Sequence, residues 1–170
     1  MPSRLTVVLL SLLLALPVVI FWLWLVIDTV PPCPEECRCE RGGLFIRCEV
    51  PSLTSVPLLR LTGLKPVSLC NHNIKSIERD NFVFLTELEI LYMCQGGLRT
   101  IELGAFNGLK MLTKLTIKDN KLSEILPGTF KSMVNLIGFD LNRNSLEHLD
   151  SGVFSGLVNI KYIYLKGNKL

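Results

Sequence analysis

A 24-residue period organises the chain from residue 64 to residue 170. Four full copies align without gaps, at 64–87, 88–111, 112–135 and 136–159, and a shortened copy follows at 160–170. Repeat positions 1, 4, 6, 11, 14, 19 and 22 are apolar in every full copy, and position 19 is always phenylalanine. A period of this length is typical of solenoids, in which each copy packs only against its neighbours. The sequence therefore predicts a stack of similar turns.

Each copy begins with a pattern that predicts one short strand. Apolar positions 4 and 6 alternate with polar or exposed positions 3, 5 and 7, as in a strand with one buried face. Because every copy has the same register, we expect the strands to lie side by side and parallel. The rest of a copy, such as SEILPGTFKSMVN at 123–135, is rich in residues that favour turns. We therefore expect an irregular or 3₁₀ return path rather than a long helix.

Position 9 falls where each strand must turn. It is asparagine in the last three copies, at Asn120, Asn144 and Asn168. An amide side chain at this position is able to satisfy backbone groups of its own turn and of the neighbouring copy. The first two copies depart from the pattern with His72 and Gly96, so the predicted asparagine ladder is incomplete at that end.

The first 30 residues differ from the rest. Residues 5–27 carry no charge, and they lie between Arg4 and Asp28. This stretch is long enough to span a bilayer, and it also fits a cleaved signal peptide, although no A-x-A site is visible. Either alternative delivers the chain after Asp28 to the extracellular side. We divide the chain into this segment at 1–30, a cysteine-containing region at 31–63 and the repeats at 64–170.

Four cysteines occur close together in the region that precedes the repeats, at Cys33, Cys37, Cys39 and Cys48. Zinc ligands are commonly spaced C-x2-C, and a redox dithiol is typically C-x-x-C near a βαβ unit; neither pattern is present. An exported segment instead favours two disulfides. The spacing alone leaves three pairings open.

Two further cysteines, Cys70 and Cys94, both occupy position 7 in consecutive copies. Neighbouring strands lie about 4.8 Å apart, and a disulfide requires Cα atoms about 4.4–6.8 Å apart. A bridge between them is therefore feasible. Two independent thiols on the exposed strand face are the alternative, because side chains in register are not well angled for bonding.

The pattern L-x-x-L-x-L-x-x-N-x-L resembles the leucine-rich repeat. The 24-residue length with phenylalanine at position 19 is similar to the extracellular type found in Toll-like receptors, Slit proteins, chaoptin-like adhesion proteins and small proteoglycans. The resemblance covers residues 33–170. It implies a fold of the α/β repeat class, a curved right-handed solenoid with short parallel strands on its concave face and a mostly irregular or 3₁₀ convex side.

The same resemblance implies a cysteine-rich cap at 31–63, in which Cys33 pairs with Cys39 and Cys37 pairs with Cys48. Residues 44–50 would supply an edge strand of this cap. The other end stops at position 11 of the fifth copy without a second cysteine cluster. We therefore expect the chain to be the N-terminal part of a longer protein.

Strand positions 2, 3, 5, 7 and 8 face away from the core, on the concave side where proteins of this family bind their ligands. All three tyrosines of the chain are at these positions, and six basic residues outnumber three acidic ones. This mildly cationic face would suit an acidic protein patch or a sulfated glycan. The residues predicted to contact a partner are Tyr92, Lys114, Lys118, Asp140, Arg143, Tyr162 and Tyr164.

The sequence does not favour catalysis, a metal or a cofactor. His72 and His148 lie in different repeats, and no nucleophile or carboxylate accompanies them in a converging arrangement. The net charge of +3 is too small for a nucleic-acid footprint. We expect an extracellular recognition module, secreted or on the cell surface, that binds a protein or glycan. A structural matrix protein of the proteoglycan type is the alternative, and membrane contact is expected only through residues 5–27.

Overall fold

The computed structural model describes residues 33–40, 45–59 and 63–170. The predicted signal or anchor at 5–27 lies outside these residues, as do parts of the predicted cap. Within the described ranges, no helix is long and apolar enough to cross a membrane. Residues Cys33–Leu170 form one compact unit.

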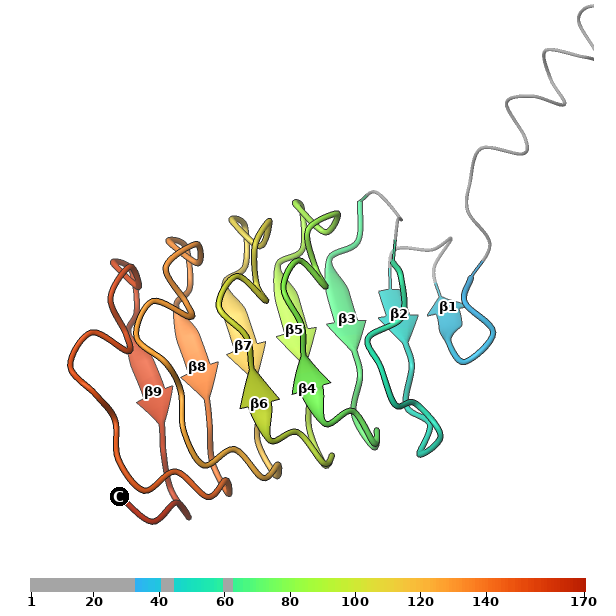
Figure 1. Cartoon of the computed structure of the whole chain (residues 1–170). Helices are drawn as coiled ribbons and strands as arrows, with labels where there is room; N and C mark the ends of the chain where they lie inside the picture. The colour runs from blue at the N-terminus through green and yellow to red at the C-terminus, as the bar shows by residue number, and fades with distance from the viewer. Residues whose placement is uncertain (1–32, 41–44, 60–62) are drawn as a thin grey trace, which may run out of the picture. The chain divides into compact units, whose positions relative to one another are not determined.

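A seven-stranded sheet runs the length of this unit, in the order β1-β2-β3-β5-β7-β8-β9 (Figure 1). Strands β3 to β9 of this sheet each come from one repeat and pair in parallel with a 24-residue register, so that Leu91 lies opposite both Val67 and Leu115. The repeat solenoid predicted from the period is thereby confirmed. The strands are β1 Arg38–Glu40, β2 Phe45–Arg47, β3 Pro66–Ser68, β5 Ile90–Tyr92, β7 Lys114–Thr116, β8 Gly138–Asp140 and β9 Tyr162–Tyr164.

The cysteine-containing region begins the sheet. Strand β2 pairs antiparallel with β1 and parallel with β3, so β1 is the edge strand. The prediction that 44–50 supplies the edge is wrong, because the passage around Cys39 folds back onto β2. Disulfides join Cys33 to Cys39 and Cys37 to Cys48, with Cα atoms 6.0 Å and 4.1 Å apart. These are the pairs that the family resemblance implies.

The return side of the repeats consists of turns and a small second sheet. Strands β4 (Ser76–Ile77) and β6 (Thr100–Ile101) pair in parallel with the same 24-residue register. Both lie over the larger sheet in Figure 1, on the convex side of the solenoid. The described residues contain no helix, as expected from the glycine, proline and serine content of this path.

The core between the two sides contains a row of phenylalanines. The rings of Phe82 and Phe106 stack with centroids 5.9 Å apart, and those of Phe106 and Phe130 are 5.8 Å apart. The fourth copy differs, because Phe139 of β8 inserts between Phe130 and Phe154 with edge contacts at 4.8 and 6.4 Å. Ring contacts therefore link the four full copies through one continuous core.

The position-9 asparagines form the expected ladder. The amide nitrogen of Asn144 donates to Ile117 O at 2.8 Å, and its Oδ1 accepts from Leu122 N at 3.2 Å. Asn120 and Asn168 make the same two bonds to the preceding copy. Each asparagine thus joins one copy to the next through buried backbone groups.

His72 and Gly96 replace this ladder at the first junction. By the pattern above, a side chain at 96 would accept from Ile74 N, but Gly96 has none, and His72 Nδ1 accepts from Ile74 N at 3.0 Å instead. A Cβ on Gly96 would lie 2.2 Å from the His72 ring, so the ring fills the space that an asparagine would occupy. The two departures from the repeat pattern are therefore one complementary substitution.

Candidate functional site

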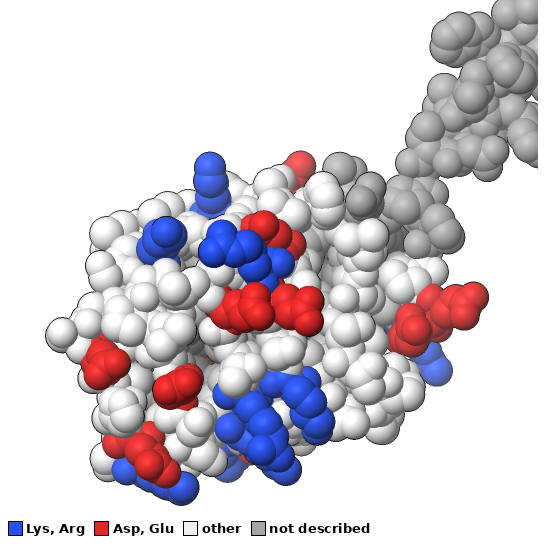
Figure 2. All heavy atoms as spheres, viewed as in Figure 1, with Lys and Arg blue, Asp and Glu red and all other residues white. Residues whose placement is uncertain are grey.

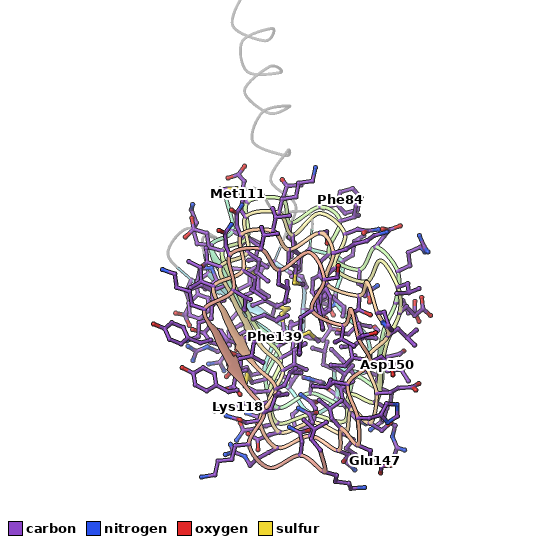
Figure 3. All side chains as sticks on the ribbon, turned by 90° about the vertical axis from the view of Figure 1, so that its left-hand side faces the viewer. Phe84, Met111, Lys118, Phe139, Glu147 and Asp150 are labelled. Carbon is purple, nitrogen blue, oxygen red and sulfur yellow. A yellow bond between two sulfur atoms is a disulfide. The ribbon has the colours of Figure 1, made fainter. Side chains whose placement is uncertain are left out.

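The outward side of the seven-stranded sheet is the concave face. Figure 3 views the solenoid along its length and shows Lys118 on the strand side, Asp150 on the opposite side and Phe139 in the interior between them. Alternation along β5 and β8 produces this division, since position 4 is buried while positions 3 and 5 are partly exposed. In β3 and β7 the position-5 residues Ser68 and Thr116 are small and buried as well.

A hollow of about 610 Å³ lies on the concave face, over β5, β7, β8 and β9. Six of the seven residues predicted to contact a partner line it: Tyr92, Lys114, Lys118, Asp140, Tyr162 and Tyr164. The repeat register explains why they converge, because residues 24 apart lie side by side on neighbouring strands. Residues from four consecutive copies thus meet at one surface.

Arg143 does not line the hollow. It lies at position 8, where its guanidinium makes a bidentate ion pair with Asp119 of the preceding copy, with Nη2 2.7 Å from Oδ2. The hydrogen bond from Arg143, helped by its positive charge, lowers the pKa of Asp119. Both residues adopt left-handed backbone, with φ of 57° and 53°. Arg143 therefore joins two turns in the structure and is set apart from the other predicted residues.

Gly138 lines the hollow without a side chain of its own. It occupies position 3 of the fourth copy, between Lys114 of β7 and Tyr162 of β9. A Cβ on Gly138 would meet no atom within 4 Å, so nothing in the fold requires glycine there. Sequence reasoning missed this residue, although a glycine at an outward strand position, away from any turn, is a signal that was available.

Aromatic rings form the walls of the hollow. Tyr162 and Tyr164 are 57% and 53% exposed, which is high for large side chains within a sheet. On the opposite side, the ammonium of Lys114 lies 5.4 Å from the centre of the Tyr92 ring. Large rings with polar tips are common in recognition surfaces, because they supply contact area at low conformational cost.

Charge is distributed unevenly along the concave face. At the first two repeats Lys65 pairs with Glu89, which leaves that end without net charge. Around the hollow, the pairing of Asp119 with Arg143 leaves four lysines and one aspartate at the outward positions, a net charge of +3. These five residues are Lys114, Lys118, Lys161, Lys166 and Asp140. On the β4–β6 side, by contrast, basic and acidic side chains are interspersed (Figure 2).

A third disulfide lies on the strand face beside the hollow. Cys70 and Cys94 are bonded, with Cα atoms 4.4 Å apart, and Cys94 contributes to the lining. Both residues are less than a tenth exposed, although the alternation predicts an outward position. The two sulfur atoms cover each other once bonded. The disulfide thus joins the first two repeats directly.

The two histidines lie in different surroundings. His72 is buried at the first junction, where its burial and the nearby charge of Lys75 lower its pKa to about 4. His148 lies on the return path of the fourth copy. Within the described ranges, no three His, Cys, Asp or Glu side chains are placed to hold a metal ion.

The stacked 24-residue turns and the position-9 ladder define a repeat solenoid of the leucine-rich type. The family model described as "Leucine rich repeat" matches residues 62–122 and 111–170, which together make up more than half of the chain. The chain therefore belongs to the leucine-rich repeat family. A comparison with curated proteins gave no match.

Solved structures share the fold. The chain superposes on the protein in "Crystal structure of TLR13-ssRNA13 complex" with a TM-score of 0.56 and 21% sequence identity. The match covers 64% of this chain and 20% of that one, so this chain spans only a fifth of the larger solenoid. At this identity the likeness concerns the arrangement of the repeats.

Proposed function

We propose that the chain is an extracellular recognition module that binds a partner protein at the concave hollow. The observation that carries the proposal is the convergence of Tyr92, Tyr162 and Tyr164 with lysines around one hollow, in which Tyr162 and Tyr164 are more than half exposed. Exposed apolar side chains that are grouped in one patch, rather than scattered singly, mark interaction sites.

Three disulfides among the described residues support an extracellular location. Disulfides persist in oxidising compartments and are rare in the cytosol. The uncharged stretch at 5–27 agrees with export, either as a cleaved signal or as an anchor. Adhesion, receptor and innate-immune roles all belong to this proposal, because each uses a solenoid to hold a protein ligand.

TLR13 is in complex with single-stranded RNA in the crystal structure named above. We nevertheless propose a protein ligand, because the hollow is walled by tyrosines and its excess charge is small. Phosphate backbones are usually bound by larger and more continuous basic surfaces.

The test is a binding screen with the disulfide-bonded chain against an array of extracellular proteins that includes collagens. Partners are then measured by biolayer interferometry against the double variant Tyr162→Ala and Tyr164→Ala. Leu126→Ala, which removes an exposed apolar side chain on the return side, is the matched control. We expect the tyrosine variant to lose at least about tenfold in affinity, as interface aromatics do, and the control to bind normally.

A partner that binds the double tyrosine variant as tightly as it binds the control Leu126→Ala would contradict the proposal. A chain that binds only fibrillar collagen, with no effect of the tyrosine substitutions, would instead support the matrix-organising alternative.

A further inference from the structure

We propose that the partner presents an acidic segment with a central apolar side chain, and that this side chain enters the hollow over Gly138. The inference rests on the proposed function and adds the chemistry of the ligand. It follows from the shape of the hollow and from the charges around it.

The shape indicates an apolar anchor. Gly138 leaves a gap in the row of outward side chains between Lys114 and Tyr162, and the neighbouring Ile137 is 38% exposed. Neighbouring strands lie about 4.8 Å apart, so two flanking strands leave a width of about 10 Å at this point. One ligand side chain fits this width, with tyrosine rings beside it and backbone beneath. Apolar contacts of this type commonly form the centre of an interface.

The charges around the hollow indicate acidic neighbours for that anchor. Lys114 and Lys118 lie on its rim, and neither has an ion-pair partner among the described residues. Lys114 is the first residue of β7 and Lys118 lies two residues after its end; four residues of extended backbone correspond to about 13 Å. In an extended segment, acidic residues two positions before and two positions after the apolar side chain would be similarly spaced, so each of these carboxylates would approach one lysine.

Asp140 is the one acidic side chain in the lining. Its Oδ1 accepts from Asn142 N at 2.9 Å, which holds the carboxylate against its own turn. An asparagine would keep this hydrogen bond and remove the negative charge. Asp140→Asn therefore distinguishes acidic from basic ligands. It should raise the affinity for an acidic ligand and lower the affinity for a basic one.

The probes are fluorescein-labelled peptides. Glu-Glu-Leu-Glu-Glu carries both features, Glu-Glu-Gly-Glu-Glu lacks the anchor, and Gln-Gln-Leu-Gln-Gln lacks the charge. Binding to the full chain, produced with its disulfides in a secretory host, is measured by fluorescence anisotropy at low salt. We expect the first peptide to bind about tenfold more tightly than either of the others, because each lacks one class of contact.

Four variants locate the site. Gly138→Val places a side chain in the gap, where a Cβ meets no atom within 4 Å, and should weaken binding of the first peptide about tenfold. Lys114→Ala and Lys118→Ala should each cost about two- to fivefold, as exposed ion pairs do. Asp140→Asn should strengthen binding about twofold. Lys131→Ala, an exposed lysine on the return path of the third copy, is the control and should leave the affinity unchanged.

Equal binding of the charged and neutral peptides would overturn the inference, as would an affinity that Gly138→Val does not change. A heparin hexasaccharide or a single-stranded RNA that binds while the acidic peptide does not would also overturn it. If a partner protein still loses affinity with the tyrosine variant in any of these cases, the proposed function stands and only the ligand chemistry is wrong.

Discussion

His72 should make the stability of the first repeat junction depend on pH. The buried ring accepts the Ile74 N–H through Nδ1, so it must be neutral, and its Nε2 has no hydrogen-bond partner among the described residues. Protonation would turn Nδ1 into a donor and would place a charge in the core beside Gly96. Burial, and secondarily the charge of Lys75, accordingly lower the pKa of His72 from 6.5 to about 4.

The magnitude follows from proton linkage. Between the unfolded pKa of 6.5 and the folded pKa of about 4, the unfolded chain binds more protons, so stability falls as the pH falls. With these two values, the free energy of unfolding should decrease by about 2 kcal/mol between pH 7.5 and pH 5.0. The loss is complete only below pH 4, where it amounts to about 3 kcal/mol.

Urea unfolding of the wild-type chain at the two pH values measures this difference. The matched comparison is the double variant His72→Asn and Gly96→Asn, which restores the asparagine pattern of the later repeats and removes the titrating ring. We expect the double variant to lose less than about 0.5 kcal/mol over the same interval, because no buried histidine remains. A loss of equal size in both proteins would refute the assignment to His72, and so would a wild-type protein equally stable at both pH values.

Three further substitutions test the packing. Asn144→Ala should destabilise the chain by about 1–3 kcal/mol in urea unfolding, because Leu122 N and Ile117 O lose their buried partner; a neutral effect would mean that the ladder is not structural. Phe106→Ala should cost about 3–5 kcal/mol, because its fully buried ring contacts phenylalanines on both sides; calorimetry showing a loss below 1 kcal/mol would argue against the stack. Replacing Cys70 and Cys94 together by alanine should lower the unfolding free energy by about 2–4 kcal/mol, because the bond closes a loop of 24 residues; reductant would then have no further effect at this junction.

Much of the fold follows from the period. Because neighbouring copies share one register, the alternation in a single copy predicts the position-4 side chain to be buried in all of them. The burial of Leu91 and Leu115 follows from the same prediction. The asparagine ladder is similarly predictable, since an amide is able to donate to one backbone group and accept from another. The convergence of six predicted residues at one surface is a consequence of the same register.

Other features depend on the space between particular residues and are not visible in the pattern. The exchange of His72 and Gly96 becomes intelligible only when the ring is found to occupy the missing side chain's volume. Gly138 lines the hollow without a side chain, and the pattern of outward side chains does not reveal the space that an absent one leaves. Arg143 shares the outward positions with the other predicted residues, but its pairing with Asp119 directs it to a different role.

The central claim is that the concave surface over β7, β8 and β9 is where a partner binds. Hydrogen–deuterium exchange of the full chain with and without a bound partner from the array tests it most directly. We predict slower exchange in peptides that contain 113–118, 137–142 and 161–166, with no change around β4 and β6. Protection confined to the return side, with unchanged exchange in the three strand segments, would contradict the account.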